Sequence, residues 1–486
     1  MNQQNSRDRK FLQMTRTPIR GLTLRLAAPS VIGTLSVAAY GIADAFFVSC
    51  LGTSASGAVG VVSSVTALIQ AVGYTLGQGA SNTAARLLGE QNSGEAKRTL
   101  TTGFAASLLA GAALAAIGWF WSEPLVLLLG ATGTIAPYAA AYVRIVLLSA
   151  PCMTASFAMG CFLRGQGNTF HAMIGVTAGA AVSAALNPLF IFTFGLGTTG
   201  AALALAMGQF VEFMLYAAFI NSRISTIKLS PKYFSFSPRV IKNIFVTGMP
   251  SFYRQGAASL SAVVMNRSLR PYGDARIAAM SIVSRIYLLI SSGVTGFGLG
   301  MQPACAYNFG AGKFDRITGA YRFCKRASAV YLTLVAAAAF VFAPRIMAAF
   351  RQEDQLINEL SLAAERRGIT MFCDFDFAPR GVESNREFIE TGTLALRMIC
   401  GAAPFLARPI LCTGLCESTG RSALASALTV CHSGLFFIIA VTLLSRMFGL
   451  RGIQMSTPVG IILAFLMAVI VEKNGERRTG TAPVRR

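Results

Sequence analysis

The chain has 486 residues, of which 54% are hydrophobic and only 13% are charged, whereas a soluble domain carries roughly 25% charged residues. This composition excludes an ordinary soluble globular protein and predicts a polytopic membrane protein. The formal net charge is +22, and the distribution of the basic residues decides what that charge means.

Apolar runs of transmembrane length follow one another along the chain, at about 20 residues for each crossing. Twelve spans are expected near 22–49, 57–80, 100–122, 134–160, 170–194, 198–220, 241–266, 276–303, 322–345, 392–415, 422–446 and 452–471. The predicted fold class is therefore an all-α integral membrane protein with twelve transmembrane helices. The polar, basic residues 1–20 show no signal peptide.

Lysine and arginine are concentrated in alternate loops. They occupy the N-terminus, the loops after spans two, six and eight, and the C-terminus, whereas the loops after spans one, three and five contain none. By the positive-inside rule, both termini are predicted to be cytoplasmic. The basic surplus is thus a topology signal and a contact for anionic lipids, and no nucleic-acid partner is expected.

The two halves of the chain repeat one another. Pro29 and Pro250 stand 221 positions apart. The same interval separates Gly52 from Gly273, Gly77 from Gly298, Gly79 from Gly300 and Gly89 from Gly310. We therefore predict two pseudo-symmetric six-helix lobes. Their ranges are 1–220 and 243–472, with a basic cytoplasmic linker at 221–242 and a basic tail at 473–486.

In the later spans the repeat interval lengthens to 253, as between Gly167 and Gly420. About 32 extra residues must therefore lie between spans nine and ten. They form a polar insertion of mixed charge at about 355–387, on the external side by topology. A tolerated surface insertion is favoured over an external cap or partner site.

The sequence contains patterns that resemble motifs of soluble enzymes but lack the flanking elements that those motifs require. The G-x-G-x-x-G at 195–200 lies between two apolar spans and is interpreted as a hairpin. No P-loop spacing occurs, so no ATPase motor is predicted. The ten cysteines are scattered and the only histidines are His171 and His432. Neither a disulfide framework, a metal site nor an enzyme active site is therefore expected.

Asp44 is the only acid in the first apolar segment. A carboxylate near the centre of a membrane helix costs roughly 2.5 kcal/mol or more, and such residues usually face a cavity and serve transport. The alternative is an acid close enough to the interface to reach water. Position alone does not decide between the two.

At this point the chain resembles a known family. The stretches YGIADAFFVSCLG (40–52), FLRGQGNT (162–169) and GFGLGMQPACAYNFGAGKFDR (296–316) are similar to the multidrug and toxin extrusion (MATE) family, in particular its bacterial multidrug-exporter branch. The resemblance implies two lobes around a V-shaped central cavity. It also implies efflux of amphipathic, often cationic small molecules in exchange for H⁺ or Na⁺. Neither enzyme activity nor a further cofactor is implied. We expect a monomer in the bacterial cytoplasmic (inner) membrane.

The resemblance also suggests a cation site in the N-terminal lobe. Asp44 and Tyr40 match the family's acid and tyrosine. Asn187 stands where the family often has an acid before proline, Ser183 replaces an asparagine, and Leu205 replaces a threonine. A one-carboxylate mechanism, with simple protonation, is therefore more credible than a Na⁺ cage.

Other polar residues within the spans have open interpretations. Glu212 lines the cavity, snorkels to the interface or pairs with a basic residue. The region around Arg254 and Gln255 contains no acid. Arg285 and Arg408, with Arg254 and Arg397, form either a polar network or a site for anionic groups, unless each lies near an interface. If they bound a pyrophosphate, the chain would be a lipid-linked oligosaccharide flippase.

Overall fold

The computed structural model describes residues 3–49, 53–129, 136–222, 224–235, 237–365 and 382–479, and within these ranges it contains helices and no strand. The α-helices are α1 (Gln3–Arg16), α2 (Ile19–Ser49), α3 (Thr53–Gly89), α4 (Ser93–Leu128), α5 (Ala136–Gly165), α6 (Thr169–Pro188), α7 (Gly197–Asn221), α8 (Pro238–Leu269), α9 (Asp274–Gly310), α10 (Phe314–Glu365), α11 (Val382–Ala402), α12 (Ala407–Ser418), α13 (Ser422–Val430) and α14 (Phe436–Thr479). Short π-helical segments follow α6 (Leu189–Thr193) and α13 (Cys431–Leu435). Single 3₁₀ turns lie at Pro231–Tyr233, Arg270–Tyr272 and Ala403–Leu406.

The helices are long and apolar enough to make a multi-pass membrane protein. Nine stretches of the described residues meet both criteria. The last of them, Ser422–Asn474, contains two helices that meet at Gly449, whose φ of 57° no helix allows. With α3 and α8, the described helices account for the twelve spans. The predicted all-α membrane fold is confirmed.

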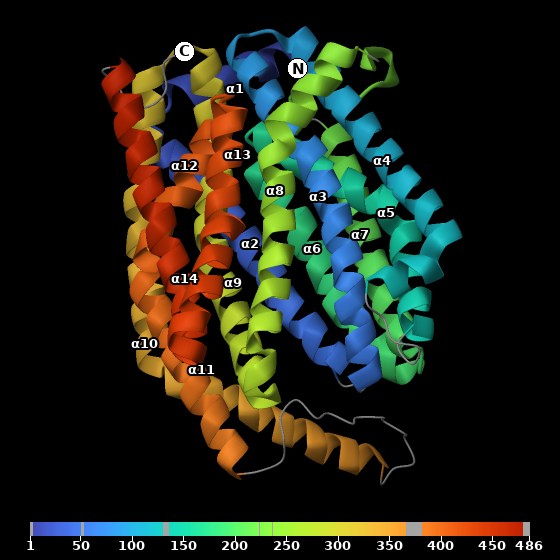
Figure 1. Cartoon of the computed structure of the whole chain (residues 1–486). Coiled ribbons are helices and arrows are strands. Elements are labelled where there is room, and N and C mark those ends of the chain that lie inside the picture. Colours follow the sequence, from blue (N-terminus) through green and yellow to red (C-terminus); the bar gives the residue numbers. More distant parts are fainter. Residues whose placement is uncertain are drawn as a thin grey trace.

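The helices form two groups side by side (Figure 1). We call α2–α7 the N-lobe and α8–α14 the C-lobe. Both termini lie at one end of the bundle, at the top of Figure 1, which we call the terminal end. The connection between the lobes, described over residues 224–235, lies there. This connection packs on the N-lobe, because Gln166 Oε1 accepts hydrogen bonds from Ser225 Oγ (2.8 Å) and from the Ile227 backbone N–H (3.1 Å).

The helix before the insertion is longer than the hydropathy predicts. Span nine was expected to end near residue 345, but α10 continues to Glu365. The first part of the predicted insertion is therefore helical. Residues 366–381 lie outside the described residues.

In the halves of the helices nearer the terminal end, the two lobes contact each other at glycines, where no side chain separates the backbones. A Cβ on Gly79 would collide with the backbone of Ile244 and approach that of Gly248, both in α8, and a Cβ on Gly300 would collide with Ala27 in α2. Ala27 and Gly248 also stand 221 positions apart. The repeated glycines thus make two pseudo-symmetric contacts, α3 with α8 and α2 with α9, which close the lobes against each other at the terminal end.

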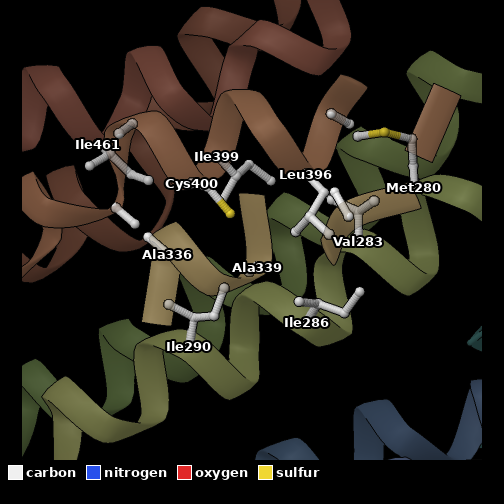
Figure 2. Close-up of a cluster of buried hydrophobic side chains, with 14 of the residues drawn as sticks. Met280, Val283, Ile286, Ile290, Ala336, Ala339, Leu396, Ile399, Cys400 and Ile461 are labelled. Atoms are coloured by element: carbon white, nitrogen blue, oxygen red, sulfur yellow. The ribbon is translucent and has the colours of Figure 1, made fainter. Parts of the chain in front are cut away.

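Large aliphatic side chains hold the C-lobe together away from this contact. Figure 2 shows Val283, Ile286 and Ile290 of α9 directed toward Leu396 and Ile399 of α11. These side chains are at most 8% exposed and belong to one buried cluster that also includes residues of α10 and α14. Close packing of this kind favours movement of the lobe as a unit.

The N-terminal helix α1 bridges the two lobes at the terminal end. On the N-lobe side, Lys10 Nζ donates hydrogen bonds to Asn168 Oδ1 (2.9 Å) and to the Gly167 carbonyl (3.1 Å). On the C-lobe side, Lys313 Nζ donates to the Thr15 carbonyl at 3.0 Å and Arg316 Nη2 donates to the Thr17 carbonyl at 2.6 Å. These cations satisfy carbonyls at and just beyond the C-terminus of α1, where positive charge is also favourable.

The docking of α1 is expected to depend on pH through Lys10. Burial, together with the positive charge of Arg25, lowers the pKa of Lys10 to about 8 from its usual 10.5. The folded protein therefore binds fewer protons than the unfolded chain between these values, so stability rises with pH across the window. Lys10→Arg stays charged throughout. We expect the Tm of the wild type to rise relative to Lys10→Arg from pH 8 to about pH 10; parallel Tm curves would contradict this.

Candidate functional site

Asp44 lies among polar side chains from two helices of the N-lobe. Its Oδ1 atom accepts a hydrogen bond from Asn187 Nδ2 at 2.9 Å and another from the Tyr40 hydroxyl at 3.3 Å. The Tyr40 hydroxyl is also in hydrogen-bonding contact with Ser183. The structure thus brings together all four residues predicted for the N-lobe cation site.

Helical spacing explains why these side chains meet. Tyr40 and Asp44 are four residues apart on α2, and Ser183 and Asn187 are four residues apart on α6, so each pair shares one helix face. The α6 face is buried. Pro188 ends α6 directly after Asn187, and the π-helical segment Leu189–Thr193 follows. Such segments often occur where a helix serves a functional site.

The cluster offers oxygen atoms to a cation. Asn187 is fully buried, and its Oδ1 atom has no hydrogen-bond partner among the residues that the structure describes. A carboxylate, an amide carbonyl and two hydroxyls are the hard ligands that Na⁺ would take, as Ca²⁺ and Mg²⁺ do. The carboxylate alone suffices for H⁺. No group of three or more His, Cys, Asp and Glu suited to a metal occurs in the described part of the chain.

A positive charge of the C-lobe faces this carboxylate. Arg285 is on α9, and its charge acts on Asp44 across the lobes. Both side chains are partly buried. Arg285 therefore belongs to the surroundings of the N-lobe cluster, and it was predicted only as one of several C-lobe arginines.

A second polar cluster joins the lobes nearer the terminal end. Gln78 Nε2 of α3 donates to Gln302 Oε1 of α9, and Gln302 Nε2 donates to Glu417 Oε2 of α12 at 2.7 Å. All three side chains are at most 5% exposed. The charge of Arg254 acts on Glu417. The predicted Gln255 lies in another bond between the lobes, donating to Gln70 Oε1 at 3.0 Å.

The other candidate residues are placed separately. Glu212 is 3% exposed and lies between α6 and α7, packed on Gly179. It is a buried residue of the N-lobe and is not a member of the Asp44 cluster. Arg397 is in an exposed position, with its Nε donating to the Phe340 carbonyl at 3.4 Å.

Arg408 has a carboxylate partner that sequence reasoning missed. Its Nε and Nη2 atoms donate to Glu472 Oε2 at 3.0 and 2.5 Å. Lys325 Nζ lies 3.6 Å from the same oxygen, and the Tyr321 hydroxyl donates to Glu472 Oε1. Glu472 directly follows the last predicted span (452–471), at the end of the predicted C-terminal lobe, and no role was predicted for it. An arginine within a membrane span usually needs an acidic partner, and this need of Arg408 could have pointed to Glu472.

Removing the carboxylate of Glu472 is expected to destabilise the C-lobe strongly. Its side chain is 6% exposed and that of Arg408 is 25% exposed, so Glu472→Gln leaves a largely buried cation unpaired, at a cost of about 3 kcal/mol. The double variant with Arg408→Met should recover most of this loss. As a control, Glu123→Gln breaks the exposed pair with Arg144 and should cost at most about 1 kcal/mol. Thermal unfolding in detergent measures all three; equal losses for Glu472→Gln and Glu123→Gln would contradict the expectation.

Comparison with known proteins places this architecture in a family. The family model MatE matches residues 29–189 and 250–378, more than half of the chain and parts of both lobes. The multidrug export protein MepA of Staphylococcus saprophyticus is 25% identical over 449 residues, which cover 92% of each chain. MepA of Staphylococcus aureus strain NCTC 8325 is 23% identical over 466 residues, which cover 96% of each chain.

A solved structure agrees with the fold. A MATE protein in complex with MaL6 superposes with a TM-score of 0.84 at 21% identity, covering 95% of this chain and 96% of that one. At this identity the likeness shows the fold alone, while the family model matches the sequence itself. The chain therefore belongs to the MatE family of multidrug and toxin extrusion transporters, and it is a transporter and not an enzyme.

Proposed function

We propose that this protein is a secondary-active antiporter that exports amphipathic, often cationic compounds in exchange for H⁺. The observation that supports this most is the Asp44 cluster, in which one carboxylate accepts hydrogen bonds from Asn187 and Tyr40 beside a buried amide oxygen. The names of the MepA relatives point to multidrug export as well.

Proton exchange is favoured over Na⁺ exchange by the charges of the cluster. Asp44 brings one negative charge, and Asn187 adds none. The charge of Arg285 acts on Asp44 and opposes the uptake of either cation, so the ligands that each ion needs decide between them. A proton needs only the carboxylate, whereas Na⁺ would have to gather several oxygen ligands beside an arginine. Na⁺ remains the alternative coupling ion.

Transport would proceed by alternating access of the two lobes. The closed contact at the terminal end corresponds to a state open on the other side of the membrane. If the basic loops make the terminal end cytoplasmic, that state is open outward. In the outward-open state Asp44 takes up a proton as the substrate leaves, and in the inward-open state it releases the proton as the next substrate binds. The two states must differ in proton affinity for the exchange to be driven. We place the protein as a monomer in the bacterial cytoplasmic membrane, in contact with anionic lipid.

The flippase alternative would need the C-lobe arginines for a pyrophosphate. Arg408 is already paired with Glu472, and Arg397 is exposed and bonded to a backbone carbonyl. Two of the four arginines are therefore engaged elsewhere, which favours the exporter.

Proteoliposomes test the proposal and the ion together. Uptake of a fluorescent lipophilic cation would be measured under an imposed H⁺ gradient, and then under an imposed Na⁺ gradient at uniform pH. We expect uptake under the H⁺ gradient alone. Uptake driven only by Na⁺ would overturn proton coupling, and uptake under neither gradient would overturn secondary-active export.

A further inference from the structure

Glu212 is a buried acid in the middle of α7 that the Asp44 cluster does not include. It is 3% exposed. It packs on the bare backbone of Gly179 in α6: a Cβ there would stand 3.0 Å from Glu212 Cβ and 3.2 Å from its Oε2 atom. Glutamate is almost never fully buried unless it is paired, so this position needs a reason.

The side chain has two hydrogen-bonding neighbours, Tyr216 and Gln209, and one nearby cation. Gln209 Nε2 donates to Glu212 Oε2 at 3.4 Å. From α5, the charge of Arg164 acts on Glu212. The other titratable groups facing it are Tyr216 of α7 itself and Tyr74 of α3; α6 presents glycine. An ionised Glu212 thus has Arg164 to stabilise it, and a neutral one suits the apolar surroundings.

Residues on the facing sides of α6 and α7 connect the position of Glu212 with that of Asp44. On the buried face of α6, Asn187, Ser183 and Gly179 follow one another at intervals of four residues. The Ser183 hydroxyl lies over the backbone of Gly208 in α7, and Glu212 is four residues beyond Gly208.

Each interval of four residues is a step of about 6 Å along the helix axis. Three successive levels therefore follow one another: Asp44 with Asn187, then Tyr40 with Ser183, then Glu212 with Gly179. This order of levels runs toward the terminal end, because α6 begins there and α7 ends there.

We propose that Glu212 is a second proton-binding residue, which receives the proton released by Asp44 and passes it toward the terminal end of the N-lobe. Asp44 gives its proton to the Tyr40 oxygen while the Tyr40 proton moves to Ser183. The Ser183 proton crosses one helical turn through a single water to the Glu212 carboxylate. Each hydroxyl gains one proton and loses one, so only Asp44 and Glu212 change charge. Glu212 then releases the proton to water at the terminal end, and Arg164 stabilises the carboxylate that remains.

This inference rests on the proposed proton coupling, and its test separates the two. Glu212→Gln keeps the size of the side chain and removes its proton chemistry; Glu123→Gln, at an exposed position, is the matched control. We expect Glu212→Gln to bind the lipophilic cation in detergent with wild-type affinity and pH dependence, because Asp44 is intact. In proteoliposomes it should lose at least about tenfold of its H⁺-driven exchange rate. Asp44→Asn should lose both the pH dependence of binding and the H⁺-driven exchange.

Wild-type exchange in Glu212→Gln would overturn the role of Glu212 and leave the proposed function standing. Absence of H⁺-driven exchange in the wild type would instead overturn the proposed function. An infrared measurement gives a readout beyond activity: the carbonyl band of a protonated carboxylic acid should appear as pH falls, and one component should be missing in Glu212→Gln.

If Glu212→Gln fails to assemble, Glu212→Asp carries the test. It should keep that infrared component and slow the exchange, since the carboxylate is withdrawn by one methylene. An unchanged exchange rate, or no titrating band assignable to this position, would overturn the proposal.

Discussion

Asp44→Asn is expected to abolish gradient-driven export while the protein still folds. Asn has nearly the shape of Asp, and its amide oxygen can still accept the hydrogen bonds that Asn187 and Tyr40 donate at 2.9 and 3.3 Å. The substitution removes only the charge and the ability to take up a proton. It therefore separates the coupling chemistry from the packing of α2 against α6.

The expected loss is large because the gradient acts through the difference in proton affinity between the two states. Glu212 receives its proton only from Asp44, so without the Asp44 carboxylate that difference disappears. Reversing a population ratio takes about 10⁴-fold in differential affinity, and none of this is left. We expect H⁺-driven uptake in proteoliposomes to fall at least about a hundredfold. Drug accumulation in cells should rise to the level of cells without the transporter.

Matched variants make this result specific. Asp315→Asn makes the same substitution at an exposed acid in the first turn of α10 and should leave transport unchanged. Tyr40→Phe removes one hydrogen bond of 3.3 Å and keeps the carboxylate, so substrate binding should weaken only severalfold, by about 1 kcal/mol. Because Tyr40 also carries the proton from Asp44 toward Glu212, H⁺-driven exchange should fall at least about tenfold, as in Glu212→Gln. Unimpaired efflux in Asp44→Asn at normal expression would contradict the coupling role.

Local spacing made half of this cluster predictable from sequence. Intervals of four residues place Tyr40 beside Asp44 and Ser183 beside Asn187 on any helix. Nothing in those intervals says that α2 crosses α6 at this level, so the meeting of the two pairs had to be expected from the family resemblance. The repeat interval of 221 likewise predicted two lobes, but only the structure shows that its glycines form the contact between them.

Other features depend on side chains far apart in the chain. The partner of Arg408 is Glu472, 64 residues later, and a hydropathy profile has no information on such pairs. Gln78 and Gln302 are 224 residues apart and are ordinary glutamines in sequence. The extension of α10 to Glu365 was missed for a different reason, because polar residues with good helix propensity end an apolar run without ending the helix.

Gly248→Val is expected to open the terminal end of the transporter. A Cβ at Gly248 would overlap the backbone carbonyl of Thr75 in α3, and backbone cannot rotate aside as a side chain does. The α3–α8 contact must therefore separate, at a cost typical of overpacking, about 1–3 kcal/mol. A cost of this size changes the population ratio of the two states by about tenfold or more, because 1.4 kcal/mol is a factor of ten. In the proposed alternating-access cycle, the closed contact is present in only one of the states.

Gly256→Val on the same helix is the control, because a Cβ there meets nothing within 4 Å. Probes on the exposed residues Glu95 and Asp315, at the terminal ends of α4 and α10, would report the distance between the lobes by spin-label or fluorescence measurement. We expect a longer mean distance and loss of transport in Gly248→Val, with wild-type values in Gly256→Val. If both variants kept the wild-type distance, the glycine contact would not be what holds the lobes closed. The repeated glycines would then serve only the packing of the two lobes against each other and not the alternation between two states.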